Sequence, residues 1–131
     1  SSQINKILKF ISQRRKIFLN YQKLLSKLKQ ISLPDHLSKY NSAHHLFIIN
    51  LKKNNQEKKE KFIKFMLKNK IILQYHYIPI YKFKVFKGKY LNKNSEIYYK
   101  SAISLPIYCG LSLKQQNYIA KKINFFFNGH N

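Results

Sequence analysis

The stretch AHHLFIINL, Ala43 to Leu51, decides the fold of this 131-residue chain. It is a continuous apolar run with β-branched residues, the pattern expected of a buried strand. Its histidines, His44 and His45, are adjacent, so on a strand one side chain points toward the core and the other points outward. Two residues on opposite faces cannot chelate one ion together without a bulge. The stretch therefore predicts a core strand with one outward histidine and no metal site.

Before this strand, the sequence predicts a long leading helix over residues 3–30. Apolar residues recur at alternating steps of three and four, and Arg14 is the only break in the stripe. Such a helix spans roughly 40 Å, more than a domain of this size is wide. Part of it should therefore project, pack on something absent from this chain, fold back near Arg14, or pair with another chain, a coiled-coil dimer being one alternative. The stripe consists of Ile4, Ile7, Ile11, Phe18, Tyr21, Leu25 and Leu28.

After the strand, helical and extended patterns alternate to the end of the chain. Together with the leading helix, this order predicts an α/β two-layer small domain over residues 43–126. The first expected helix runs from a cap at Asn54–Asn55 to a left-handed end at Asn69, and its apolar face consists of Phe62, Phe65, Met66 and Leu67. A strand over Ile71–Tyr77 follows, and then a short helix that is capped by Asn94 or Ser95 and ends near Ala102. The last elements are an extended piece over Leu105–Tyr108 and a helix that begins with a capping box of Ser112 and Gln115.

The formal charge of +22 by itself suggests a nucleic acid or another anionic partner. However, only Arg14 and Arg15 among the 26 basic residues are arginine, while lysine, isoleucine and asparagine are abundant. AT-rich codons account for that pattern, and a dedicated binder would favour arginine for phosphate and guanine contacts. YKFKVFKGKY, Tyr81 to Tyr90, interleaves rings with lysines as a base-stacking surface would. We expect any nucleic-acid binding to be non-specific, and keep a basic binding domain as an alternative.

Several chemistries are excluded by residue counts. Three glycines cannot build a glycine-rich phosphate loop, and four scattered acids form no recognisable carboxylate pair. Cys109 is the only cysteine, so neither an internal disulfide nor a cysteine cluster can form, and a buried apolar role is expected for it. No apolar run approaches the roughly 18 residues of a membrane span, and no signal-like segment opens the sequence. We expect a cytoplasmic protein with no membrane partner.

Four motifs in order resemble the C-terminal part of the DegT/StrS-type sugar aminotransferases. The resemblance covers about residues 10 to 125 and implies the small domain of the aspartate-aminotransferase fold. Within the family, HYIPIY and LPIYCGLSLK are most similar to the aminotransferases of pseudaminic-acid synthesis, which aminate a UDP-linked keto-sugar with glutamate. The motifs are RRKIFLNYQKLL from Arg14, SAHHLFIINL from Ser42, KNKIILQYHYIPIY from Lys68 and AISLPIYCGLSLKQQNYIAKKI from Ala102.

The resemblance implies which residues meet the substrate. The segment HY-x-PIY is similar to a loop that covers the sugar nucleotide, so His76, Tyr77 and Tyr81 are candidate substrate contacts, and His45 is a further candidate at the same cleft. The family uses pyridoxal phosphate, held by a lysine and an acidic partner on a larger N-terminal domain that this chain lacks. We therefore expect no catalytic residue and no bound cofactor in this chain. Arg14 should lie where the larger domain packs.

The resemblance also implies partners for an intact parent enzyme. These are a UDP-linked sugar, an amino-acid amino donor, and a second subunit in a homodimer. A regulatory or interaction domain that dimerises through the leading helix is a further alternative.

Overall fold

An antiparallel three-stranded sheet of order β1-β2-β3 lies at the centre of the computed structural model, which describes residues 4–35, 42–53, 56–75, 77–86 and 92–129. The strands are β1 (Ile31–Ser32), β2 (Phe47–Leu51) and β3 (Ala102–Leu105). The central strand pairs Phe47 with Leu105 and Leu51 with Ile31. Phe47, Ile49 and Leu51 are buried and the residues between them are half-buried. The predicted core strand is thus present, but it is shorter than expected and fully buried on one face only.

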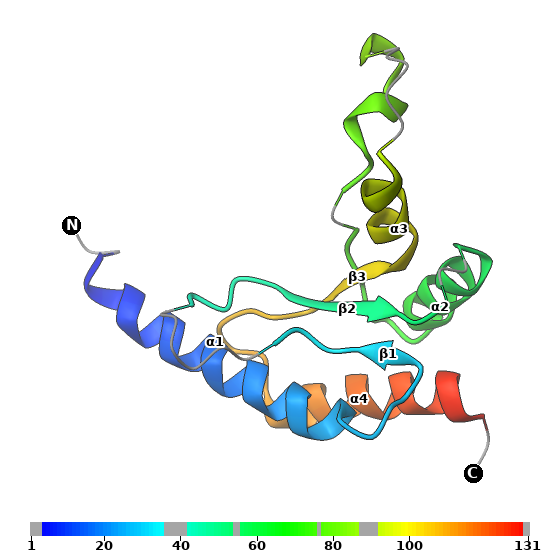
Figure 1. Ribbon diagram of the computed structural model, residues 1–131. Coiled ribbons are helices and arrows are strands. Elements are labelled where there is room, and N and C mark those ends of the chain that lie inside the picture. Colours follow the sequence, from blue (N-terminus) through cyan, green and yellow to red (C-terminus); the bar gives the residue numbers. More distant parts are fainter. Residues whose placement is uncertain (1–3, 36–41, 54–55, 76, 87–91, 130–131) are drawn as a thin grey trace.

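Two helices cover one face of this sheet, as Figure 1 shows: α1 (Ile4–Leu25) and α4 (Leu113–Asn128). The ring of Tyr21 packs on Phe47 at 5.1 Å between centroids, and its hydroxyl donates to the carbonyl of Pro106 at 3.1 Å. Asn20 donates to Gln116 across the two helices at 2.8 Å. Helices on one side of a sheet confirm the predicted two-layer α/β class.

The leading helix differs from its prediction in three respects. It ends at Leu25 rather than near residue 30, because the chain turns there and enters β1. It is continuous through Arg14, so the expected fold-back there is wrong. Its stripe is divided by burial: Ile4 and Ile7 are exposed, whereas Phe18, Tyr21 and Leu25 are buried within the chain. A coiled coil along the whole stripe is therefore ruled out, since half of the stripe already belongs to the core.

Helix α2 (Gln56–Lys68) packs against the C-terminal half of α4. Phe62 is fully buried, and its ring lies 5.0 Å from that of Phe126. Leu67, predicted on the apolar face, is 60% exposed. The left-handed residue after this helix is Lys70, with φ of 61°, and not the predicted Asn69. The predicted cap at Asn54–Asn55 lies outside the described residues.

The expected strand over Ile71–Tyr77 does not form among the described residues of that segment. Of these, only Gln74 bridges to the sheet, exchanging two backbone hydrogen bonds with Ser104 at 2.9 and 3.1 Å. The strand beside β2 is instead Ala102–Leu105, which begins before the extended piece predicted over Leu105–Tyr108. Because β3 takes the pairing edge of β2, the segment from Ile71 can reach only the outer edge of β3.

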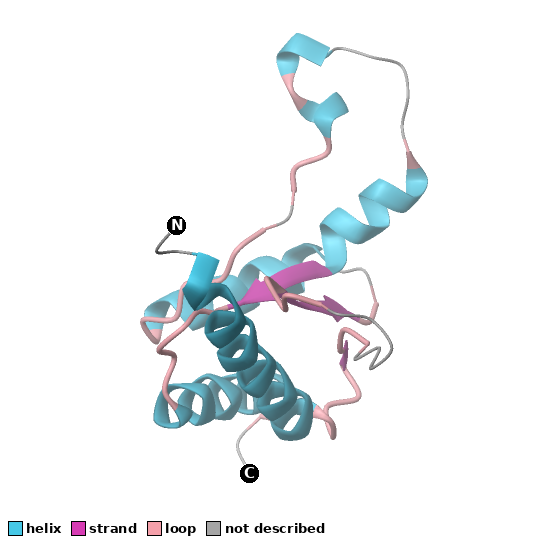
Figure 2. Ribbon diagram, turned by 90° about the vertical axis from the view of Figure 1, so that its left-hand side faces the viewer, coloured by secondary structure: helices cyan, strands magenta, loops and turns pink. Residues whose placement is uncertain are grey.

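An arm extends away from the sheet (Figures 1 and 2) and contains two short 3-10 helices, η1 (Ile80–Lys82) and η2 (Lys84–Phe86), followed by α3 (Lys93–Ser101). The side chain of Asn92 caps α3 by accepting from the backbone of Ser95 at 3.1 Å. The predicted caps, Asn94 and Ser95, are wrong because both lie inside the first turn of the helix.

The end of the chain agrees with expectation. Ser112 and Gln115 form the predicted capping box of α4. Ile119 and Ile123 are buried. Cys109 is the exception to this agreement, because it was expected to be buried and is only half-buried, with its thiol facing the carbonyl of Phe10 at 3.7 Å. Among the helices of the described ranges, none combines the length and apolar character that crossing a bilayer requires.

Candidate functional site

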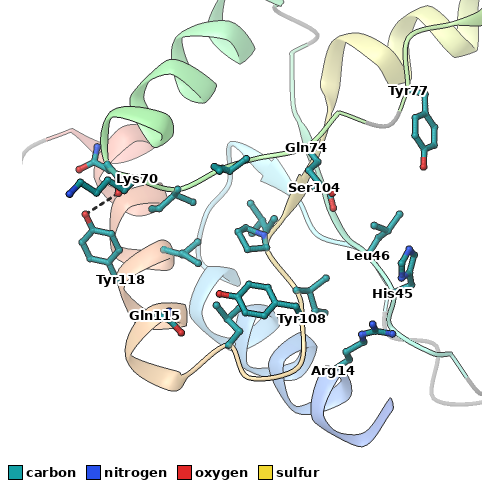
Figure 3. Close-up of a pocket in the computed structure, with 18 residues that line it drawn as sticks. Arg14, His45, Leu46, Lys70, Gln74, Tyr77, Ser104, Tyr108, Gln115 and Tyr118 are labelled. Atoms are coloured by element: carbon teal, nitrogen blue, oxygen red, sulfur yellow. Dashed lines mark hydrogen bonds between the residues drawn. The ribbon is translucent and has the colours of Figure 1, made fainter. Parts of the chain in front are cut away.

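An open cleft of about 990 Å³ lies beside the outer edge of β3 (Figure 3). Its walls come from α1, the residues before β2, the segment after α2, β3 with the loop that follows it, and the first turns of α4. Its volume falls in the range that holds small-molecule ligands. The lining residues are Arg14, His45, Leu46, Asn69, Lys70, Ile71, Ile72, Gln74, Tyr77, Ser104, Leu105, Pro106, Ile107, Tyr108, Leu111, Gln115, Tyr118 and Ile119.

The two adjacent histidines lie on different sides of the chain, as predicted. His44 is 7% exposed, has φ of 46°, and packs its ring on Phe18 at 4.6 Å between centroids. His45 is exposed and lines the cleft. His45 is therefore in a position to contact a ligand, while His44 belongs to the core.

Arg14 also lines the cleft, on the same side as His45 and opposite Lys70 and Tyr118 (Figure 3). Its Nε is buried and has no hydrogen-bond partner among the described residues. Buried polar groups in folded proteins are almost always paired, so an orphan donor needs an explanation such as a ligand or water. The break in the apolar stripe is thus part of the cleft.

The remaining predicted contacts are distributed differently. Tyr77 lines the cleft and is 74% exposed. Tyr81 does not line it: its hydroxyl donates to Glu96 of α3 at 2.8 Å, and desolvation, together with that bonded carboxylate, raises the pKa of Tyr81. His76 lies outside the described residues. The structure thus brings His45 and Tyr77 together, and the substrate roles of all four residues stay predictions.

Several lining residues were not predicted from the sequence as ligand contacts. Tyr108 and Gln115 border the cleft, and Tyr118 donates to the carbonyl of Asn69 at 3.3 Å. Gln115 also accepts from the backbone of Ser112 at 2.9 Å, so its side chain is committed to the helix cap. Only Tyr108 carried a usable signal, since it is a polar-tipped ring directly after a buried apolar run. The others are recognisable only once α4 has packed beside the segment after α2.

A second, smaller pocket of about 280 Å³ surrounds Lys59 of α2. This side chain is 3% exposed, and its Nζ donates to the carbonyl of Tyr99. The ammonium lies 4.9 Å from the ring centroid of Tyr75 and 5.1 Å from that of Tyr99. Desolvation lowers the pKa of Lys59 to about 8. This lysine joins α2 to the base of the arm.

The described residues of the cleft do not suit a pyridoxal cofactor on their own. Anchoring that group takes an amine for an imine and an acid beside the ring nitrogen. Among the lining residues that the structure describes there is no carboxylate, and their single lysine, Lys70, is exposed. Lys59 is enclosed by rings in the other pocket. In the described ranges no three histidine, cysteine or acidic side chains gather into a metal site.

The chain belongs to the DegT/DnrJ/EryC1/StrS aminotransferase family, whose model matches residues 1–124. Among curated proteins, it is 26% identical over 125 residues to the UDP-4-amino-4,6-dideoxy-N-acetyl-beta-L-altrosamine transaminase of Helicobacter pylori, covering 93% of this chain and 33% of that protein. Among solved structures, it matches Helicobacter pylori PseC, an aminotransferase involved in pseudaminic acid biosynthesis, with a TM-score of 0.91 and 25% identity over 98% of this chain and 36% of that one.

A further solved relative establishes the fold from a more distant sequence. The putative sugar aminotransferase Spr1654 of Streptococcus pneumoniae, in its PLP form, matches with a TM-score of 0.85 and 20% identity, covering 97% of this chain and 33% of that one. The resemblance seen in the sequence motifs is therefore confirmed. The chain spans about a third of the length of these relatives.

Proposed function

We propose that this chain is the small C-terminal domain of a pyridoxal-phosphate-dependent aminotransferase that acts on a nucleotide-linked keto-sugar in amino-sugar synthesis. The observation that carries the proposal is the match to the family over residues 1–124, combined with a large cleft that has no acidic side chain among its described residues. A cleft of that kind suits an anionic, polyhydroxylated ligand better than it suits a cation.

In this proposal the domain binds and orients the substrate rather than making bonds. The amine and acid that the cofactor requires come from the part of the parent protein that this chain does not span. From this chain, His45 and Tyr77 supply polar tips at the cleft, and the ring of Tyr108 supplies an apolar surface beside them. Fixed donors and acceptors of this kind position a sugar at low entropic cost when it reacts.

The proposal is tested on the intact parent polypeptide by incubating it with pyridoxal phosphate, glutamate and a UDP-linked 4-keto-sugar. We expect an amino-sugar nucleotide, detected by mass spectrometry. The 131-residue chain alone should give none. Failure of the parent to aminate any nucleotide-linked keto-sugar would exclude the proposed activity.

Replacing His76 by Ala tests the substrate side of the cleft in the parent enzyme. We expect kcat/KM for the sugar nucleotide to fall roughly 5- to 150-fold, because one buried hydrogen bond to the sugar is lost. The cofactor absorbance should stay nearly unchanged. Because His45 lines the described cleft, His45→Ala should behave similarly. An unchanged kcat/KM in correctly folded variants would exclude a substrate role for both histidines, and a lost cofactor spectrum would assign them to the cofactor instead.

A further inference from the structure

We infer that Arg14 and His45 form an oxyanion-binding subsite at one end of the cleft, which takes a phosphate or carboxylate group of the ligand. The inference rests on the proposed function, since it assigns the charged part of the ligand within the same cleft. It concerns a residue, Arg14, for which the sequence indicated a break in an apolar stripe and a place where a larger domain packs, but no ligand.

The first argument is the unpaired donor. The Nε of Arg14 is buried without a hydrogen-bond partner among the described residues. Gln30 has the other such atom in the described part of the chain, but the amide nitrogen of Gln30 already donates to Phe127 and Asn128 at 3.3 and 3.1 Å. No hydrogen bond or salt bridge is found for the guanidinium of Arg14 among the described residues. Nε itself is enclosed by the protein, but Arg14 lines the cleft, so its guanidinium can meet a ligand there.

The second argument is the choice of residue. Arginine presents donors in a planar fork that matches phosphate and carboxylate geometry, whereas lysine is a point charge. Lysine accounts for all the basic residues of the chain except Arg14 and Arg15. Arg14 lines the cleft, whereas its neighbour Arg15 is exposed on the helix surface. The bias toward lysine that explains the overall charge therefore does not explain Arg14.

The third argument is the surroundings. Arg14 and His45 lie on the same side of the cleft (Figure 3), and an imidazole adds a further donor to an oxyanion. No carboxylate among the described lining residues competes for the guanidinium. Lys70 lines the opposite side as a single point charge, whereas Arg14 has the imidazole of His45 on its own side, so the anionic group is assigned to Arg14. Leu105 and Ile107 also line the cleft, so the rest of the ligand would contact apolar side chains.

The chemistry leaves two sources for the oxyanion: the diphosphate of a nucleotide-linked sugar and the carboxylate of an amino-acid donor. Both accept from a guanidinium in the same way. UDP, pyrophosphate and glutamate are therefore separate arms of the test, and uridine is the uncharged control.

The experiment observes the two arginine Nε–Hε signals of the isotope-labelled 131-residue chain by NMR while each compound is added at about 150 mM salt, which screens non-specific attraction. Arg14→Lys assigns the signals, and Arg15→Lys is the matched control. We expect the Arg14 signal to shift and saturate with UDP or with glutamate but not with uridine, while the Arg15 signal stays in place. Arg14→Lys should weaken the binding at least about tenfold, and Arg15→Lys should leave it unchanged.

Two outcomes would overturn the inference: an Arg14 signal that none of the anions moves at about 10 mM, or signals of Arg14 and Arg15 that move together. A response to UDP and pyrophosphate but not to glutamate assigns the diphosphate, and the reverse assigns the carboxylate. These results are separable from the proposed function. The parent enzyme can transfer amino groups even if the Arg14 signal does not shift, and Arg14 can bind anions even if the parent has no such activity.

Discussion

At the scale of single residues, position relative to the sheet decides what each polar side chain can do. His44 and His45 are chemically identical neighbours, yet one packs on Phe18 and the other faces the cleft. Tyr77 and Tyr81 belong to one motif, yet only Tyr77 lines the cleft, because Tyr81 is bonded to Glu96 of the arm. A sequence motif therefore locates the region of a binding site, and the hydrogen bonds that each residue makes within the chain decide which residues of the motif line the cleft.

The buried ammonium of Lys59 predicts how the free energy of unfolding depends on pH. Because desolvation lowers its folded-state pKa to about 8, unfolding takes up a proton between that pH and the ordinary lysine pKa. The contribution of this residue to the free energy of unfolding should therefore rise as pH increases through this window, by about 2 kcal/mol between pH 7.5 and pH 9.5. Urea unfolding at several pH values measures that rise.

Lys59→Met provides the comparison, because it keeps an unbranched side chain between the two rings and removes the titrating group. The increase in the free energy of unfolding between these pH values should be about 2 kcal/mol smaller in this variant than in the original chain. Burial also raises the pKa of Tyr21, which lowers stability above about pH 10, so the comparison stays below that pH. Equal pH slopes in both proteins would show that Lys59 has an ordinary pKa in the folded chain.

At the scale of elements, caps and burial determine where helices begin and which faces remain open. The capping box of α4 satisfies the backbone of Gln115 through Ser112 at 3.2 Å and holds the loop beside the cleft. The first two turns of α1 have no comparable support from the core. Ile4, Ile7 and Leu8 are 71%, 51% and 77% exposed.

Ser112→Ala should lower the free energy of unfolding by about 1 kcal/mol, because the backbone amide of Gln115 in the first turn of α4 loses its hydrogen-bond acceptor. Ser26→Ala is the matched control: the Ser26 hydroxyl bonds only to the carbonyl of Lys23 at an exposed turn, so a change within about 0.5 kcal/mol is expected. Chemical denaturation of both variants checks the difference. Equal losses would mean that the cap adds nothing beyond an ordinary exposed hydroxyl.

The open start of α1 predicts self-association of the isolated chain. Three exposed aliphatic side chains on adjacent turns form an apolar patch, which favours contact with another copy or with a further domain. Analytical ultracentrifugation should show a concentration-dependent increase in mass, and Leu8→Glu should reduce it. A strictly monomeric chain over the same concentration range would contradict this prediction.

At the scale of the whole molecule, the lysines behind the charge of +22 are spread along the sequence rather than concentrated in one segment. In the arm, Lys82 forms an ion pair with Glu96 at 3.0 Å and lies over the ring of Tyr99. Tyr81 bonds to the same carboxylate. The first ring and lysine of the suspected base-stacking stretch are thus engaged within the arm, which weakens the alternative of a nucleic-acid-binding domain.

We therefore predict DNA binding that is non-specific, with affinity no tighter than roughly micromolar at physiological salt. Dispersed lysines neutralise phosphates without reading base edges, so binding should weaken about equally for all sequences as salt rises. Competition between unrelated duplexes measures this. A preference of about 100-fold or more for one sequence would contradict the prediction.

The sequence by itself determined the two-layer α/β class, the capping box, the core strand and the family, because each depends on a local pattern or on motifs in a fixed order. The tertiary structure decided which strand pairs with β2, where α1 ends, and that Arg14 belongs to a cleft and not to a coiled-coil interface. These depend on competition for one sheet edge and on side chains brought together from positions as distant as Arg14 and Tyr118, which no local pattern can report.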